Sequence, residues 1–214
     1  MFTGIVEEKG QLETIKQVGQ GLRLKIKASI VTQDVSTGDS ISVNGVCLTV
    51  TEFTEQSFSV DVIPETFRGS ALSTLQSQSY LNLERAMAAN GRFGGHFVSG
   101  HVDAVGKIAS TWTEDNALYV EIAVPKENMQ YLTMKGSISV DGTSLTVFNV
   151  KEESFVISLI PETRKATILG EKKKGDVVNI EYDMLAKYME RLLDVKGQQT
   201  NTGITKQKLT DYGF

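Results

Sequence analysis

Several short segments of the chain alternate between apolar and polar residues. In residues 22–28 every second residue is apolar and those between are Arg or Lys, and residues 57–62 alternate in the same way with Ser and Asp. A period of two is typical of β-strands with one buried and one exposed face. Residues 155–159 keep this phase later in the chain. We therefore predict a chain built mainly from half-buried strands.

The pattern recurs because the sequence is duplicated. Residues 40–66 align with residues 137–163 at a constant offset of 97, and 15 of the 27 aligned positions are identical. An offset of 96 aligns residues 3–6 with residues 99–102. Agreement of this extent is not an accident of composition. Two copies at so long a period argue against a solenoid, which needs several short repeats, and favour two tandem domains.

Each copy contains the same hairpin signal between two alternating segments. Asn44-Gly45 and Asp141-Gly142 occupy equivalent positions, and both dipeptides favour a type I′ turn because their residues tolerate positive φ. About six short strands per copy, with turn signals between them, predict a closed or nearly closed antiparallel barrel. Loop-forming residues near 90–95 mark the boundary. The predicted domains are residues 1–93 and 94–183.

Helical periodicity is found in two places. One is the short segment of residues 83–89. The other is residues 184–196, where apolar residues recur at helical spacing: Met184, Leu185, Tyr188, Met189, Leu192 and Leu193. This apolar stripe can pack on the chain's own barrel or against helices of other subunits, and the pattern favours neither. We expect a flexible tail at residues 197–214, which begin with a polar stretch.

Composition narrows the class of protein. The 214 residues are 40% hydrophobic with a net charge of −4, which argues against disorder and against nucleic acid or anionic membranes as partners. A single cysteine cannot form an internal disulfide, and the first residues do not resemble a signal peptide. The longest apolar runs fall far short of the roughly 20 residues that span a bilayer. We therefore expect a soluble, cytoplasmic protein.

Few side chains are suited to catalysis. Neither a dinucleotide fingerprint nor a phosphate loop is present. His96 and His101 lie in a Gly-rich stretch without the neighbours of a metal site, so we expect no metal. Each histidine can exchange protons or can simply be a hydrogen-bonded loop residue. Cys47 and its repeat mate Ser144 can be packing residues or can line equivalent pockets, and two equivalent pockets would bind two like ligands.

Four segments together resemble the lumazine-binding repeat family of riboflavin synthase alpha chains: residues 1–6, 44–50, 94–103 and 159–163. The likeness extends from Met1 to about Leu193. The resemblance implies an all-β protein of two tandem six-stranded Greek-key β-barrels, each binding one lumazine. It also implies that the C-terminal helix at residues 184–196 supports a homotrimer. Each active site would join the N-terminal barrel of one subunit to the C-terminal barrel of its neighbour.

The reaction implied by the resemblance is a transfer without a cofactor. Two molecules of 6,7-dimethyl-8-ribityllumazine give riboflavin and 5-amino-6-ribitylamino-2,4-pyrimidinedione by moving a four-carbon unit. The 7-methyl group of the donor is acidic because its carbanion delocalises into the ring system, and a nucleophile activates C7 of the acceptor. Some members of this family are enclosed in a lumazine synthase shell, so lumazine synthase is a candidate partner.

The resemblance also assigns residues to the two lumazine sites. The first lumazine would contact Gly4, Ile5, Val6, Cys47, Leu48, Thr49, Asp61, Val62, Ile63, Pro64, Glu65 and Thr66. The second would contact Gly100, His101, Val102, Lys135, Ser144, Leu145, Thr146, Ser158, Leu159, Ile160, Pro161, Glu162 and Thr163. The family residues implicated in catalysis match Phe2, Ser40, Cys47, His96, His101 and Asp183.

Three other interpretations stay open. A lumazine-binding fluorescent protein would keep the barrels but bind one chromophore without converting it. A flavin reductase or carrier is a second possibility, and the reductase would need a separate partner that binds the nicotinamide. A structural assembly module rests only on the apolar stripe, which a catalytic trimer explains equally well. The presence of Cys47, His96, His101 and an intact second repeat favours the enzyme.

Overall fold

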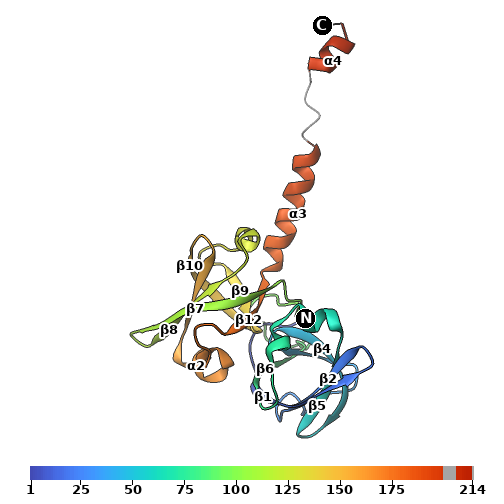
Figure 1. Cartoon of the computed structure of the whole chain (residues 1–214), viewed down its shortest axis with the longest axis vertical. Helices are drawn as coiled ribbons and strands as arrows, with labels where there is room; N and C mark the ends of the chain where they lie inside the picture. Colours follow the sequence, from blue (N-terminus) through green and yellow to red (C-terminus); the bar gives the residue numbers. More distant parts are fainter. Residues whose placement is uncertain (200–205, 214) are drawn as a thin grey trace. The chain divides into compact units, whose positions relative to one another are not determined.

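The computed structural model describes residues 1–199 and 206–213. Residues 1–183 form one compact unit, and the helices that follow belong to another. The first unit consists of two closed barrels, each of six antiparallel strands (Figure 1). The prediction of two similar tandem barrels is therefore confirmed.

The two barrels have the same strand order. The first consists of β1 (Glu8–Val18), β2 (Gly21–Lys27), β3 (Ser40–Val43), β4 (Val46–Thr54), β5 (Ser57–Val62) and β6 (Tyr80–Arg85). The second consists of β7 (Ala104–Glu114), β8 (Ala117–Ala123), β9 (Ser137–Val140), β10 (Thr143–Val150), β11 (Ser154–Leu159) and β12 (Val177–Tyr182). The order around the first barrel is β1-β2-β5-β4-β3-β6, and the second repeats it as β7-β8-β11-β10-β9-β12. Because β3, β4 and β5 are consecutive hairpin strands and β2 lies beside β5, the connectivity is a Greek key.

Apolar residues on alternate positions fill both barrel interiors. Leu24 and Ile26 of β2 are fully buried in the core of the first barrel. Val120 and Ile122 of β8 take the same places in the second. The period of two in the sequence therefore reports the inward face of each strand, as expected for a sheet closed on itself.

The predicted helix at residues 83–89 is wrong. Strand β6 continues to Arg85; it pairs with β1 up to Leu83 on one side and with β3 from Leu83 to Arg85 on the other. Leu81 and Leu83 are fully buried in the barrel. The ladder hydrogen bonds and this burial depend on tertiary partners, and they outweigh the local helical periodicity of a short segment.

The two predicted hairpin turns lie against each other. Asn44 and Gly45 have φ values of 48° and 80°, and Asp141 and Gly142 have 43° and 76°, which are the positive values of a type I′ turn. A Cβ atom on either glycine would lie 2.7 Å from the backbone N of the other. Glycine therefore provides both the turn conformation and the close approach of the barrels.

Two asparagines at equivalent positions connect the barrels reciprocally. The Asn82 side chain donates to the carbonyl of Asp141, and the Asn179 side chain donates to the carbonyl of Asn44, both at 2.8 Å. Both asparagines are buried, so these hydrogen bonds are shielded from water. Leaving the side-chain amides or the carbonyls without partners would be costly. The contact between the copies thus repeats the symmetry of the duplication.

Short helices connect the strands: α1 (Pro64–Arg68), η1 (Ala71–Thr74), η2 (Lys126–Tyr131), α2 (Pro161–Ala166) and η3 (Ile168–Gly170). Helices α1 and α2 begin at equivalent prolines, whose fixed φ suits the first turn of a helix. They follow directly on β5 and β11 and so lie where the resemblance places lumazine contacts.

The C-terminal unit contains α3 (Met184–Gln199) and α4 (Lys206–Asp211). Helix α3 extends three residues beyond the predicted end at residue 196, and α4 is a short helix within the predicted tail. The tail's flexibility stays a prediction, and its residues 200–205 and 214 lie outside the described residues. Of the predicted apolar stripe, Met184 is half-buried, and the other five residues are more than 60% exposed: Leu185, Tyr188, Met189, Leu192 and Leu193. Among the described helices, none has the length and apolar character needed to cross a membrane.

Candidate functional site

The N-terminal segment lies against the linker between the barrels. Phe2 is fully buried; its N–H donates to the carbonyl of Val98 at 2.7 Å, and Val98 N–H donates back at 3.2 Å. His96 N–H donates to the carbonyl of Thr3 at 3.1 Å. The first residues of the chain are therefore held beside the segment that contains both histidines.

Two glycines at equivalent positions each contact the barrel of the other repeat. Gly4 precedes the first barrel, but its carbonyl accepts a hydrogen bond from Ser144 N–H of β10 at 2.7 Å. Gly100 precedes the second barrel, and its carbonyl accepts from Cys47 N–H of β4 at 2.8 Å. Both glycines have positive φ, 77° and 82°. A Cβ atom on Gly4 would lie 2.6 Å from Ser144 Cβ, and one on Gly100 would lie 2.5 Å from Cys47 Cβ.

These contacts pair the Gly4 and Gly100 segments with the opposite lumazine sites from those expected. The resemblance implies that Gly4, Ile5 and Val6 contact the first lumazine together with Cys47. It implies that Gly100, His101 and Val102 contact the second together with Ser144. The structure brings Gly4 to Ser144 and Gly100 to Cys47. Val102 packs against the core of the first barrel. The expected grouping keeps each glycine segment with the barrel that follows it in the chain. In the structure each glycine segment instead contacts the barrel of the other repeat before its own first strand begins.

A cavity of about 320 Å³ lies where the Gly100 segment meets Cys47. It is lined by Val46, Cys47, Glu65, Thr66, Gly69, Ser70, Gly100, His101 and Val102. Six of these nine residues belong to the predicted lumazine contacts. Val46, Gly69 and Ser70 were not predicted, although Val46 lies within the segment of residues 44–50 that carries the resemblance. This "first site" combines β4 and α1 of one repeat with the Gly100 segment of the other.

The "second site" is the equivalent crossing, where Gly4 meets Ser144. Ser144 Oγ lies 2.6 Å from His96 Nδ1. His96 is almost completely buried, and burial lowers its pKa, while the nearby carboxylates of Asp183 and Glu181 act in the opposite direction. His96 is therefore favoured as the neutral imidazole, which can accept or donate a hydrogen bond to the serine hydroxyl.

The remaining predicted residues differ in what their side chains can reach. Leu48, Val62 and Leu159 point into the barrel cores, so only their backbone groups can contact a ligand. Lys135 has a φ of 68°, and its N–H donates to the carbonyl of Val147 at 2.8 Å. The following predicted residues are exposed or half-buried: Val6, Thr49, Ile63, Pro64, Leu145, Thr146, Ser158, Ile160, Pro161, Glu162 and Thr163.

Ser40, Ile5 and Asp61 are predicted residues with surroundings separate from the first-site cavity. Ser40 lines a separate cavity of about 170 Å³, together with residues that include Asp34 and Arg85. Ile5 lines another, of about 380 Å³. Asp61 accepts two hydrogen bonds from the Arg23 guanidinium, at 2.6 and 2.9 Å, and Arg23 lowers the pKa of this carboxyl. None of the three is among the residues that line the cavity with Cys47.

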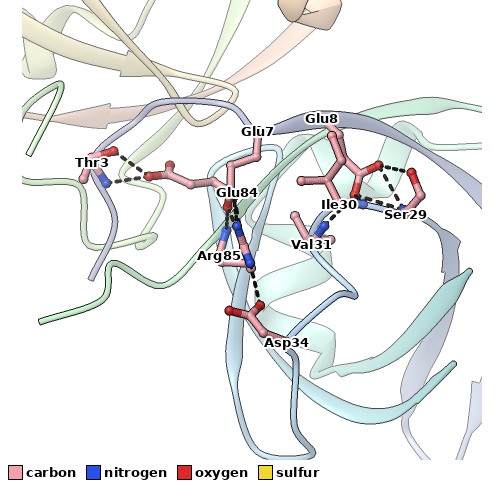
Figure 2. A network of polar contacts seen from close by, with 9 residues as sticks. All are labelled: Thr3, Glu7, Glu8, Ser29, Ile30, Val31, Asp34, Glu84 and Arg85. Atoms are coloured by element: carbon pink, nitrogen blue, oxygen red, sulfur yellow. Dashed lines mark hydrogen bonds and ion pairs between the residues drawn. The ribbon is translucent and has the colours of Figure 1, made fainter. Parts of the chain in front are cut away.

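Two buried glutamates at equivalent positions had no predicted role. Glu84 of β6 accepts hydrogen bonds from Thr3 and Gly4, and Glu181 of β12 accepts them from Ser99 and Gly100. Figure 2 shows Glu84 directed at Thr3 and, on the other side of β6, Arg85 between Glu7 and Asp34. The signal was present in the sequence, because both glutamates align in the duplication.

The chain matches a known protein family in both repeats. The family model for the lumazine binding domain matches twice, at residues 3–86 and 99–183. Riboflavin synthase of Bacillus subtilis (strain 168) is 51% identical over the whole of both chains. The chain belongs to the riboflavin synthase family. Other members include the riboflavin synthase of Actinobacillus pleuropneumoniae, 47% identical over the whole of both chains.

A more distant member of the riboflavin synthase family is that of Schizosaccharomyces pombe, which is 40% identical over 91% of this chain and 94% of its own. Among solved structures, LumP complexed with riboflavin has a TM-score of 0.79, and LumP complexed with 6,7-dimethyl-8-(1'-D-ribityl) lumazine has 0.77. Both are 23% identical and cover 85% of this chain and 99% of LumP. They establish the common two-barrel fold.

Proposed function

We propose that the chain catalyses the riboflavin synthase reaction. Two molecules of 6,7-dimethyl-8-ribityllumazine react, one donating a four-carbon unit and the other accepting it. The products are riboflavin and 5-amino-6-ribitylamino-2,4-pyrimidinedione. Because one molecule is donor and the other acceptor, the atoms and electrons balance without an external oxidant or reductant. No cofactor is needed for this transfer.

The observation that supports this function most directly is the pair of equivalent crossings. In each, a glycine carbonyl meets the N–H of a residue at the start of a strand, Cys47 or Ser144. A Pro-Glu-Thr helix start follows the neighbouring strand in both repeats. Two like sites in one chain suit a reaction that consumes two like molecules.

The two sites differ in their polar side chains, as donor and acceptor roles require. The first site has Cys47 and His101. The second has Ser144 hydrogen-bonded to His96. His101 lines the first cavity and is exposed, so it is the candidate for exchanging the proton of the 7-methyl group there. The hydroxyl of Ser144, or a water beside it, is the candidate nucleophile for C7 of the other lumazine.

Positioning supplies most of the rate enhancement in this proposal. Holding two reactants in reacting geometry can lower a barrier by about 7–11 kcal/mol. General acid or base catalysis contributes about 10²- to 10⁴-fold. The glycine crossings, with their backbone hydrogen bonds of 2.7 and 2.8 Å, are rigid elements against which two flat rings can be held.

We also propose that the protein is a cytoplasmic homotrimer whose active sites each combine a first site with a second site of a neighbouring subunit. The exposed apolar side chains of α3, such as Leu185 and Leu192, supply a surface for helix-to-helix association. Sedimentation equilibrium tests the trimer. Co-sedimentation with lumazine synthase tests that protein as a further partner.

The deciding experiment supplies the purified protein with 6,7-dimethyl-8-ribityllumazine alone, without metal or nucleotide. Riboflavin formed at half the molar amount of lumazine consumed supports the dismutation. Bound, fluorescent and unconverted lumazine at one per chain would instead identify a non-catalytic lumazine-binding protein. A spectral change only after NADH and flavin are added would identify a flavin reductase.

A further inference from the structure

Glu84 and Glu181 are buried carboxylates at equivalent positions of β6 and β12. Their residues are 5% and 3% exposed, and among the described residues neither forms an ion pair with Lys or Arg. A buried carboxylate is unfavourable unless hydrogen-bond donors replace its water. Burial raises the pKa of Glu84, and the donors of Thr3, Gly4 and Ile5 oppose that rise.

Each carboxylate holds the backbone directly before a site residue. Glu84 Oε1 accepts from Thr3 N–H at 2.7 Å and from its hydroxyl at 2.8 Å, and Oε2 accepts from Gly4 N–H at 3.0 Å. Glu181 Oε1 accepts from Ser99 N–H and its hydroxyl, both at 2.6 Å, and Oε2 accepts from Gly100 N–H at 2.9 Å. The first of these networks is visible in Figure 2.

The hydroxyls extend the network by one residue. Thr3 Oγ1 accepts a hydrogen bond from Ile5 N–H, and Ser99 Oγ accepts one from His101 N–H, both at 3.3 Å. The carboxylate therefore orders a segment that runs through the glycine to the residue after it. In the first site that residue is His101, which lines the cavity.

Each glycine is held by both repeats at once. The N–H of Gly4 is bound by Glu84 of the first barrel, while its carbonyl binds Ser144 N–H of the second. The N–H of Gly100 is bound by Glu181 of the second barrel, while its carbonyl binds Cys47 N–H of the first. A displaced carboxylate would therefore shift the wall of the site in the opposite barrel.

We propose that Glu84 and Glu181 are positioning residues that act across the barrel interface. Glu181 orders the Gly100-His101 segment of the first site, and Glu84 orders the Gly4-Ile5 segment of the second. The proposal rests on the proposed function, because it assumes that both sites bind a lumazine. It goes beyond that function by assigning to each site a glutamate that orders one of its walls and that belongs to the repeat opposite Cys47 or Ser144.

The single cysteine makes the first site separately observable. Cys47 is half-buried and lines the cavity, and the sequence has no other cysteine. Its rate of alkylation by a maleimide, and the lumazine concentration that halves this rate, report the first site alone. A Cys47→Ser, Ser144→Cys double variant moves the thiol to the second site and reports that site in the same way.

The test introduces Glu84→Gln and Glu181→Gln into both reporters, with Glu114→Gln as a control on an exposed strand end. Each Gln turns one acceptor oxygen into a donor that faces another donor. Glu181→Gln is expected to raise the half-protecting lumazine concentration at Cys47 about tenfold to a hundredfold, the effect of losing a hydrogen bond to a charged group. At the relocated thiol of the double variant, Glu84→Gln is expected to produce that shift.

Crossed effects separate positioning from general damage to a barrel. An effect of Glu84→Gln at Cys47 equal to that of Glu181→Gln, or no effect of Glu181→Gln beyond the Glu114→Gln control, overturns the proposal. Should a Gln variant unfold by circular dichroism, Ser99→Ala and Thr3→Val replace it, since they remove only the hydroxyl link, and a smaller crossed effect is expected. If lumazine protects neither thiol and yields no riboflavin in the parent proteins, the proposed function fails and this proposal fails with it.

Discussion

His96 Nδ1 and Ser144 Oγ lie 2.6 Å apart, and this contact joins the linker between the barrels to the second site. In the first site the corresponding strand position is Cys47, and the histidine near it is His101. The two sites therefore each have one histidine, taken from different positions of the repeat. Duplicated sites that are alike in backbone and different in polar groups suit two identical molecules with different roles.

The first prediction concerns the pH dependence of stability at His96. Burial lowers its pKa in the folded state, whereas the unfolded chain keeps a value near about 6.5. The unfolded state then binds more protons as the pH falls through that value, so the free energy of unfolding decreases below about pH 6.5. Urea unfolding at pH 7.5 and 5.5 should show a larger decrease for the wild type than for His96→Asn. Equal decreases would contradict the burial argument.

The second prediction is that His101→Ala slows turnover without abolishing it. Loss of a general acid or base is expected to reduce the rate by about 10²- to 10⁴-fold, while the two rings are still held together by the rest of the site. Riboflavin formation under single-turnover conditions measures the effect, and protection of Cys47 by lumazine controls for binding. Complete loss of turnover in a folded protein that still binds lumazine would contradict the prediction.

The third prediction separates backbone strain from close contact at Gly100. An alanine there would place Cβ 2.5 Å from Cys47 Cβ, so Gly100→Ala should disrupt the first site and abolish protection of Cys47 by lumazine. Gly19 has a φ of 59° with nothing within 4 Å of the added Cβ. Gly19→Ala should therefore cost only about 1–2 kcal/mol of stability and leave protection unchanged. Similar binding defects in both variants would argue against the close contact as the cause.

The fourth prediction concerns Asp141, which is fully buried in the turn where the first repeat has Asn44. Burial raises the pKa of Asp141, and Lys172, with Nζ 3.5 Å from Oδ2, opposes the rise. A raised pKa means that the ionised form destabilises the fold above the unfolded-state pKa of about 3.9. Asp141→Asn should thus raise the free energy of unfolding at pH 7, because the amide carries no charge to be desolvated.

Chemical denaturation over a range of pH checks this expectation. The difference between Asp141→Asn and the wild type should shrink as the pH falls towards about 4, where the carboxyl of the unfolded chain is protonated as well. The amide is compatible with the turn, because Asn44 Oδ1 accepts from Asn82 N–H at 2.7 Å just as Asp141 Oδ1 accepts from Asn179 N–H at 2.8 Å. A loss of stability at pH 7 would show that the attraction of Lys172 exceeds the cost of burial.

Local patterns predicted the elements well where each element is defined by neighbouring residues. The alternation in residues 22–28 reports one strand face, and Asn44-Gly45 reports one turn, because both depend on geometry within a few residues. The same kind of argument failed at residues 83–89. There the ladder partners in β1 and β3, which lie far away in sequence, determine a strand.

The sequence by itself determined the duplication and the two barrels, and the resemblance supplied six of the nine residues that line the first-site cavity. The sequence did not determine the grouping of the site residues, because chain order places Gly4 with Cys47 and Gly100 with Ser144. Only the tertiary structure reverses this, since the reciprocal packing of the barrels brings each glycine segment onto a strand of the other repeat. The roles of Glu84 and Glu181 were hidden for the same reason: a buried carboxylate acquires its meaning from the donors that surround it, and those donors come together only when the barrels have packed.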